Sequence, residues 1–63
     1  MSQADTKTRI LDAAEQLFAR DGFHIASMRA LTEQADVNLA AVNYHFGSKE
    51  KLLQAVFARR LGP

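Results

Sequence analysis

The sequence predicts an all-α protein, a small helical bundle of about four helices. Apolar residues recur three and four positions apart in its two longest candidate segments, which is the period of a helix with one buried face. Three residues that favour helix starts, Ser27, Asn38 and Ser48, mark the beginnings of the other elements. With 63 residues and no cysteine, the chain has length for one core and no disulfide framework. We therefore expect a single domain.

The first helix is expected from about Asp5 to Arg20. Its apolar stripe consists of Ile10, Leu11, Ala14, Leu17 and Phe18. Gly22 can take the positive φ that commonly ends a helix. Phe23 and Ile25 are then expected to fill the turn beneath the next helix.

The second helix is expected to start at Ser27. Three apolar residues share one of its faces: Met28, Leu31 and Ala35. After Ala35 the chain passes through residues 36–37 to Asn38, so only a few residues separate this helix from the next. Two short helices joined by so tight a turn indicate a helix-turn-helix, in which the second helix enters the major groove of DNA and the first crosses the backbone.

The third helix lies within the most informative segment of the chain, VNLAAVNYHFGSKE from Val37 to Glu50. Asn38 can accept a backbone N–H of its first turn. That turn is formed by Leu39, Ala40 and Ala41. Two alanines let the backbone approach another surface closely, and an alanine methyl can pack on the methyl of thymine. The segment therefore has a leading end that is shaped to enter a groove.

The remainder of this segment separates a buried side from a polar one. Val42 and Phe46 are four residues apart and share the inward face. Three polar or aromatic residues flank it: Asn43, Tyr44 and His45. Gly47 is expected to end the helix and Ser48 to cap the next. Lys49 would then stand at a helix start, where a phosphate meets both an ammonium charge and free backbone N–H groups.

The fourth helix is expected to begin after Ser48. Four apolar residues should face inward: Leu52, Leu53, Val56 and Phe57. Arg59 and Arg60 are favourably placed near its negative end, and together with Lys51 they are interpreted as solvated charges. Part of its apolar face, at Phe57 or Leu61, is expected to lack cover.

These residues together resemble a known family. The pattern consists of Thr8-Arg9-Ile10-Leu11, Ala13-Ala14, Leu17-Phe18, Gly22-Phe23, Ser27-Met28-Arg29, Ala35, Val37 and His45-Phe46-Gly47-Ser48-Lys49-Glu50. It covers nearly the whole chain and resembles the N-terminal DNA-binding domain of TetR-family transcriptional regulators. Residues 37–46 are similar to a branch of bacterial repressors that includes fatty-acid-responsive ones. The resemblance implies a homeodomain-like helix-turn-helix that reads double-stranded DNA for a cytoplasmic repressor.

The same resemblance implies further partners. Full-length members of the family bind an inverted-repeat operator as homodimers, and a larger helical domain binds a small-molecule effector. This chain, residues 1–63, is expected to lack that effector-binding and dimerisation domain and to bind DNA weakly on its own. No cofactor is implied.

The sequence departs from the common family pattern at three positions. Asp36 stands where a turn glycine is usual, and Asp tolerates left-handed backbone better than most residues. Ala40 stands where glycine is frequent. Asn43 replaces a tyrosine that usually contacts phosphate, so it could read an adenine edge bidentately or donate to phosphate.

Ten residues are predicted to contact DNA: Ser27, Arg29, Asn38, Leu39, Ala40, Ala41, Asn43, Tyr44, His45 and Lys49. Four of them would face base edges: Leu39, Ala40, Ala41 and Asn43. Another four would fix the register on the backbone: Arg29, Tyr44, His45 and Lys49.

Five of these residues have a simpler alternative role. Arg29 and Lys49 could be solvated charges, and His45 could be a favourable charge at a helix end. Tyr44 could be a partly buried core residue, and Leu39 could belong to the core instead of the groove-facing surface. The four phenylalanines are interpreted as core or interface residues, because their spacing is helical.

Composition excludes several classes of function. The two histidines have no cysteine partner and no ligand spacing for a metal, the serines are better explained as caps than as nucleophiles, and no glycine-rich phosphate loop exists, so we expect no enzyme. No apolar run is long enough to span a membrane.

Net charge is the one global property that argues against a nucleic-acid partner. The formal charge of +1 is small for a protein that binds a polyanion. The positions of the charged residues matter more than the net charge, because acidic residues gather in or just after the first helix: Asp12, Glu15 and Asp21. The second hypothesis is a helical protein-interaction module, which would account equally well for the amphipathic stripes of the first and fourth helices. Salt dependence of binding would discriminate it from a DNA reader.

Overall fold

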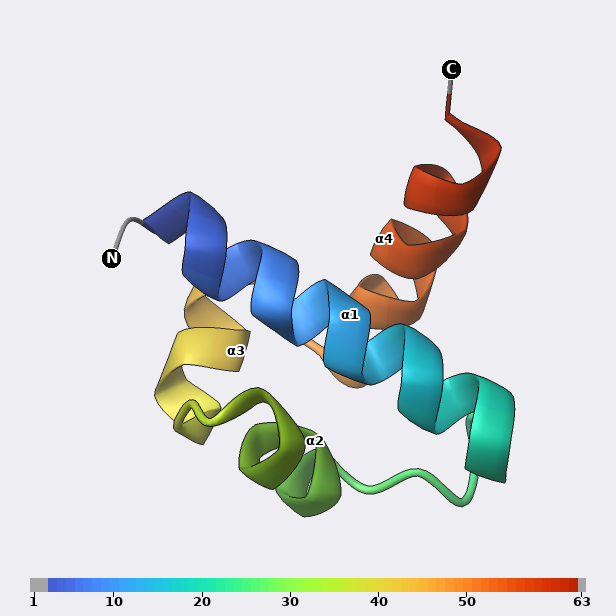
Figure 1. Ribbon diagram of the computed structural model, residues 1–63, viewed down its shortest axis with the longest axis horizontal. Coiled ribbons are helices and arrows are strands. Elements are labelled where there is room, and N and C mark those ends of the chain that lie inside the picture. Colours follow the sequence, from blue (N-terminus) through green and yellow to red (C-terminus); the bar gives the residue numbers. More distant parts are fainter. Residues whose placement is uncertain (1–2, 63) are drawn as a thin grey trace.

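Four helices make up the part of the chain that the computed structural model describes, residues 3–62, with side chains from residue 6 onward. They are α1 (Gln3–Asp21), α2 (Met28–Ala35), α3 (Leu39–His45) and α4 (Lys49–Leu61). The described residues contain no strand, which confirms the all-α prediction. Helix α1 crosses the molecule, with α2 and α3 on one side of it and α4 extending away on the other (Figure 1). Helix α1 begins two residues before, and ends one residue after, its expected limits.

The core is formed around α1, which contacts each of the other three helices. Its buried members are Ile10, Ala13, Ala14, Leu17, Ala26, Leu31, Ala35, Val42, Leu52 and Val56. Leu11 and Phe18, also expected in the stripe of α1, are partly buried against this cluster. No polar or charged side chain is buried among the described residues. Burial of apolar surface on one central helix is therefore what holds the domain together.

The turn between α1 and α2 differs from expectation at one residue. Gly22 has a φ of 84° and ends α1 as predicted, but Ile25 is 76% exposed instead of filling the turn. The methyl group of Ala26 fills that position, because a backbone hydrogen bond from Ala26 N–H to the Gly22 carbonyl (3.0 Å) folds the loop and turns residue 26 inward. Phe23 packs edge-on against Phe18 with ring centroids 5.4 Å apart.

All three predicted helix caps form. The backbone N–H of Ala30 donates to Ser27 Oγ at 3.0 Å, that of Ala41 to Asn38 Oδ1 at 2.8 Å, and that of Lys51 to Ser48 Oγ at 3.1 Å. Each cap satisfies one of the backbone donors that a helix start leaves without an intrahelical partner. The boundaries of α2, α3 and α4 are therefore set by local hydrogen bonds.

Asp36 takes the left-handed conformation predicted for it, with φ 58° and ψ 51°. Its backbone N–H donates to Glu33 O at 3.3 Å, and the next N–H, of Val37, donates to Thr32 O at 3.1 Å. These two bonds close the end of α2, as in the common C-terminal motif in which glycine usually takes the left-handed position. The turn is thus made with a residue that has a Cβ.

We expect Asp36→Gly to stabilise the domain slightly, by about 0.5 kcal/mol. Glycine takes this φ without steric cost, which favours the folded state, but it loses more backbone freedom on folding, which limits the gain. Asp36→Ala should have the opposite effect, because alanine has the Cβ and lacks the polar side chain that makes Asp tolerant of this region. Thermal unfolding of the three proteins measures the order. A lower midpoint for Asp36→Gly than for Asp36→Ala would contradict this account.

Helix α4 is buried over less of its length than expected. Leu52 and Val56 are buried and Leu53 is half-buried, but Phe57 is 58% exposed, so the prediction that it faces inward is wrong. The physical reason is that the end of α4 extends beyond the other helices (Figure 1), so α1 meets its last turn only through Arg59 and Arg60, and no described helix covers most of Phe57. The exposure of Phe57, and of Leu61 at 84%, agrees with the other expectation, that this part of the apolar face lacks cover.

Arg59 and Arg60 are not simply solvated charges, as the sequence suggested. Arg59 pairs with Asp12 at 2.7 Å and with Glu15, and Arg60 pairs with Glu15 at 2.6 Å. The hydrogen bond from the Arg59 guanidinium lowers the pKa of Glu15 below its usual value. These pairs join α4 to α1, which packing brings together although the residues are more than forty positions apart. Lys51 is exposed, as expected.

Candidate nucleic-acid interface

Helices α2 and α3 form the predicted helix-turn-helix. Residues 36–38 connect them, and the two helices are in contact. On the outer side a shallow hollow lies between them, lined by Met28, Arg29, Thr32 and Leu39. The structure therefore brings two predicted site residues, Arg29 and Leu39, to the same hollow.

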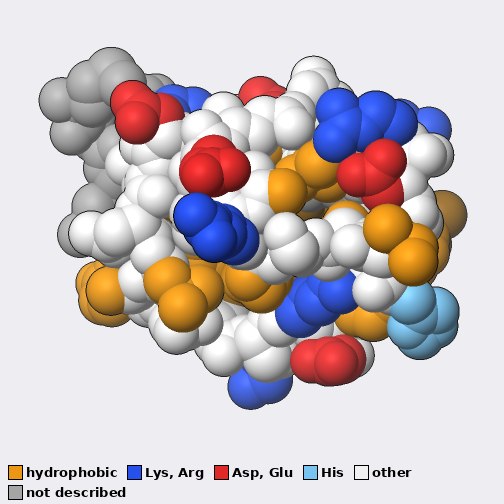
Figure 2. All heavy atoms as spheres, turned by 90° about the horizontal axis from the view of Figure 1, so that it is seen from below, with side chains coloured by type: hydrophobic (Ala, Val, Ile, Leu, Met, Phe, Trp, Pro, Cys, Tyr) orange, Lys and Arg blue, Asp and Glu red, His pale blue; other side chains and the backbone are white. Residues whose placement is uncertain are grey.

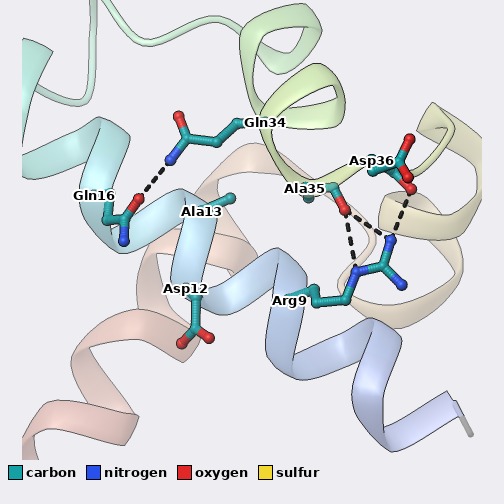
Figure 3. A pocket seen from close by; sticks show the side chains of 7 residues that line it. All are labelled: Arg9, Asp12, Ala13, Gln16, Gln34, Ala35 and Asp36. Carbon is teal, nitrogen blue, oxygen red and sulfur yellow. Dashed lines mark hydrogen bonds between the residues drawn. The ribbon is translucent and has the colours of Figure 1, made fainter. Parts of the chain in front are cut away.

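The turn is fixed from behind by Arg9 of α1, a residue to which the sequence analysis assigned no role. Its Nη2 donates to the carbonyls of Ala35 at 2.8 Å and Asp36 at 2.7 Å, and its Nε donates to Ala35 at 3.2 Å. Figure 3 shows this side chain reaching from α1 to the end of α2. The last carbonyls of a helix have no intrahelical partner, and the guanidinium fork can satisfy two of them at once. We call these contacts the Arg9 clamp.

A second polar contact lies beside the Arg9 clamp. Gln34 Nε2 of α2 donates to Gln16 Oε1 of α1 at 2.6 Å (Figure 3).

The sequence gives little sign of the role of Arg9. It shows only that a polar residue stands next to Ile10 of the apolar stripe. The partners of Arg9 are backbone carbonyls 26 and 27 residues away, and a backbone carbonyl carries no sequence signal.

Helix α3 has a buried side and an outward side, as predicted. Val42 is fully buried and Phe46 packs partly against the core. The outward side carries Leu39, Ala40, Asn43 and Tyr44, all exposed. Tyr44 is 74% exposed, so the alternative that it belongs to the core is wrong. Leu39 is 50% exposed, which leaves half of its side chain on the outer surface.

Ala41 and His45, the other predicted contacts on α3, are partly buried. Ala41 donates its backbone N–H to the Asn38 cap. The imidazole of His45 lies edge-on to the Tyr44 ring, with centroids 5.1 Å apart. His45 is in the last turn of α3, where a positive charge would be favourable.

Ser27 and Asn38, the predicted contacts that precede α2 and α3, are exposed, but one polar atom of each side chain already has a hydrogen-bond partner. Ser27 and Asn38 use a side-chain oxygen for capping, which leaves the Ser27 hydroxyl hydrogen and the Asn38 amide NH₂ available as donors. The exposed Arg29 lies 3.9 Å from the exposed carboxylate of Glu33. A pair this long and this exposed contributes little, so the Arg29 guanidinium can change partner readily.

Lys49, the last predicted contact, begins α4 and is partly buried. Its Nζ lies 4.5 Å from the centroid of the Phe23 ring. The sequence indicated a basic residue at this helix start but gave no sign of the aromatic partner, which belongs to the turn before α2.

The surface on the side of α2 and α3 is mixed in character. Figure 2 views the molecule from that side, and basic, acidic and hydrophobic side chains are interspersed over it. Within the described residues, no group of three or more His, Cys, Asp or Glu side chains is arranged to hold a metal ion. None of the described helices is long and apolar enough to cross a membrane.

Comparison with known proteins identifies the arrangement. Residues 10–56 match the family model described as bacterial regulatory proteins, tetR family. The chain is 45% identical over 51 residues to the HTH-type transcriptional regulator UidR of Escherichia coli K12, covering 81% of this chain and 26% of that protein. It is 38% identical over 61 residues to the nicotine-responsive transcriptional repressor HdnoR of Paenarthrobacter nicotinovorans, covering 97% and 31%. It is 39% identical over 59 residues to the transcriptional regulator SrpR of Pseudomonas putida, covering 94% and 28%.

The chain spans about a quarter to a third of the length of these relatives. Their names describe transcriptional regulators, a function that fits a helix-turn-helix and not an enzyme. The family match covers residues 10–56 and therefore includes all ten predicted DNA contacts, from Ser27 just before α2 to Lys49 at the start of α4. The chain belongs to the TetR family of bacterial regulatory proteins, and it carries the family's N-terminal helix-turn-helix domain.

Proposed function

We propose that this chain is the operator-reading domain of a TetR-type repressor and binds double-stranded DNA sequence-specifically, with α3 in the major groove. The observation that carries the proposal is the outward side of α3. Leu39, Ala40, Asn43 and Tyr44 are exposed on a short helix whose opposite side is anchored by the buried Val42. A helix held in this way can present side chains to base edges without reorganising.

The side chains divide into two groups by chemistry. Leu39, Ala40 and Ala41 offer apolar contact to a thymine methyl, and the Asn43 amide can bond to both groups of an adenine edge. Phosphate contacts would come from residues with free donors or positive charge: Ser27, Arg29, Asn38, Tyr44, His45 and Lys49. Phosphate contacts fix the register and base contacts specify the sequence.

In the longer proteins of the family, we propose that this domain works as one of two identical reading heads on an inverted-repeat operator. A two-fold dimer matches the symmetry of such a site. The exposed apolar side of α4, at Phe57 and Leu61, is suited to packing against further helices of a longer chain, which would supply the dimer interface and an effector site. Repression would follow from occlusion of a promoter in the bacterial cytoplasm, and an effector would relieve it by changing the distance between the heads.

The relatives' names favour this proposal over the alternative of a protein-interaction module. Selection from a pool of random duplexes, followed by titration of the selected duplex at two salt concentrations, tests it directly. A groove reader should enrich an inverted repeat or one half of it. Its affinity should fall steeply with salt, because each phosphate contact contributes about 0.9 to the slope of log K against log salt.

Tyr44→Ala is expected to weaken binding to the selected duplex about tenfold, since the change removes a ring and a hydroxyl from the reading surface. Phe57→Ala is the matched control, because Phe57 is also an exposed aromatic residue but lies on α4, away from α3. Fluorescence anisotropy with labelled duplex measures both. Equal losses in the two variants would argue against the assignment of α3 as the reading helix. Absence of any enriched duplex, even after fusion to a dimerising coiled coil, would refute DNA binding.

A further inference from the structure

The ammonium group of Lys49 lies over the face of an aromatic ring. Lys49 is the first residue of α4, and Phe23 belongs to the turn between α1 and α2, 26 positions earlier in the chain. Nζ is 4.5 Å from the ring centroid, which is within the range in which the ring quadrupole attracts a cation. The contact therefore joins the segment before the helix-turn-helix to the helix after it.

The ring of Phe23 is itself held in place by its neighbours. Phe18, which packs against the core, contacts it edge-on at 5.4 Å between centroids, with an interplanar angle of 68°. His24 contacts it at 5.6 Å and 70°. With these contacts around it, the ring is a fixed platform for the lysine.

The partner of Lys49 is an aromatic ring, whereas the arginines of this chain have carboxylates or backbone carbonyls as partners. Four arginines pair with carboxylates: Arg20, Arg29, Arg59 and Arg60. Arg9 is engaged with the carbonyls of the turn. None of the ion pairs among the described residues includes Lys49. Since an aromatic ring orders an ammonium without neutralising its charge, Lys49 keeps both its charge and the N–H donors that point away from the ring.

We propose that Phe23 is a positioning residue for DNA binding, in that its ring holds the Lys49 ammonium at the start of α4 ready to receive a phosphate. The inference rests on the proposed function and adds a residue outside α2 and α3 to it. A free lysine side chain must give up considerable rotational freedom to hold one geometry. When the ring has already ordered the side chain, part of that loss precedes binding, and the phosphate contact becomes stronger.

The test uses the duplex selected by the wild-type chain and four variants: Phe23→Leu, Phe23→Tyr, Lys49→Gln and the double variant Phe23→Leu with Lys49→Gln. Phe23→Leu removes the ring and keeps an apolar side chain, and we expect it to weaken binding about two- to fivefold, the range of an exposed cation–π contact. Lys49→Gln should lower the slope of log K against log salt by about 0.9. Phe23→Tyr keeps the aromatic face and should bind like the wild type.

The double variant separates positioning from a general effect on the fold. If Phe23 acts through Lys49, then Phe23→Leu should weaken binding in the wild type and change nothing in the Lys49→Gln background. Equal weakening in both backgrounds would overturn the proposal, as would unchanged or tighter binding by Phe23→Leu alone. Circular dichroism at the temperature of the binding measurement verifies that each variant is folded.

A measurement without DNA tests the contact itself. A methylene group over an aromatic ring resonates upfield, so the ε-methylene protons of Lys49 should shift upfield in the wild type and in Phe23→Tyr but not in Phe23→Leu. A wild-type shift equal to that of an exposed lysine would overturn the proposal. Failure of the wild type to bind any duplex would refute the proposed function and this role with it, whereas weakening by Lys49→Gln without weakening by Phe23→Leu would refute this role alone.

Discussion

Replacing Leu31 with alanine is expected to lower the free energy of unfolding by about 3 kcal/mol, among the largest losses expected from a single side chain here. Leu31 is 1% exposed and lies in the middle of α2, where it joins the core around α1. Truncating a buried leucine loses its transfer free energy and leaves a cavity, for a total of about 2–5 kcal/mol. A domain of this length has a total stability of about 3–9 kcal/mol. We therefore expect the melting temperature to fall by about 10–25 °C.

Ile25→Ala is the matched control for this prediction. It also shortens an aliphatic side chain, but Ile25 is mostly exposed in the turn before α2. Its effect should stay within about 0.5 kcal/mol, as for other surface substitutions. Urea denaturation followed by circular dichroism gives both values. A larger loss for Ile25→Ala than for Leu31→Ala would mean that the turn is filled by Ile25, as the sequence alone suggested, and not by Ala26.

Replacing Arg9 with methionine is expected to cost about 2 kcal/mol. The change removes the Arg9 clamp, whose hydrogen bonds carry a charged donor, and such bonds contribute about 1.5–3 kcal/mol. Methionine keeps a long apolar stem, so the packing of this side chain should otherwise change little. The turn should also open more often, and faster amide hydrogen exchange at Val37, whose N–H closes the end of α2, would report it.

Two further variants show whether the fork or the charge matters in the Arg9 clamp. Arg9→Lys keeps the charge but cannot serve two carbonyls in the same plane, so its loss should fall between wild type and Arg9→Met. Arg20→Met removes an exposed guanidinium whose partner is the adjacent, partly exposed Asp21, and it should leave the unfolding midpoint nearly unchanged. If Arg9→Met unfolds at the same denaturant concentration as Arg20→Met, the Arg9 clamp does not stabilise the helix-turn-helix.

The features that could be predicted from sequence depend on neighbouring residues. Ser27, Asn38 and Ser48 each accept a backbone N–H three positions ahead, so a short sequence pattern is sufficient to place the cap. The same holds for Gly47, whose φ of 94° follows the end of α3. Periodicity likewise identified Val42 as the buried residue of α3 and left Tyr44 on its surface.

The features that could not be predicted depend on contacts between distant segments. Phe57 fits the apolar stripe of α4, yet whether it is covered depends on where the other helices end. The interpretation of Arg59 as a solvated charge failed because its partners Asp12 and Glu15 lie on α1. The pairing of Phe23 with Lys49 has the same character. None of these contacts has a spacing rule, because the chain between the partners can fold in many ways.

The sequence by itself determined the four helices, their caps, the tight turn at Asp36 and the division of α3 into an inward and an outward side. These properties follow from hydrogen bonds and side-chain periodicity within a few residues, where the covalent chain already holds the partners close. Only the tertiary structure decided that Arg9 fixes the turn, that α4 is tied to α1 by ion pairs, and that Lys49 rests on Phe23. Those contacts form between side chains, or with backbone carbonyls, that packing of the core around α1 brings together, so their geometry exists only once the helices are docked.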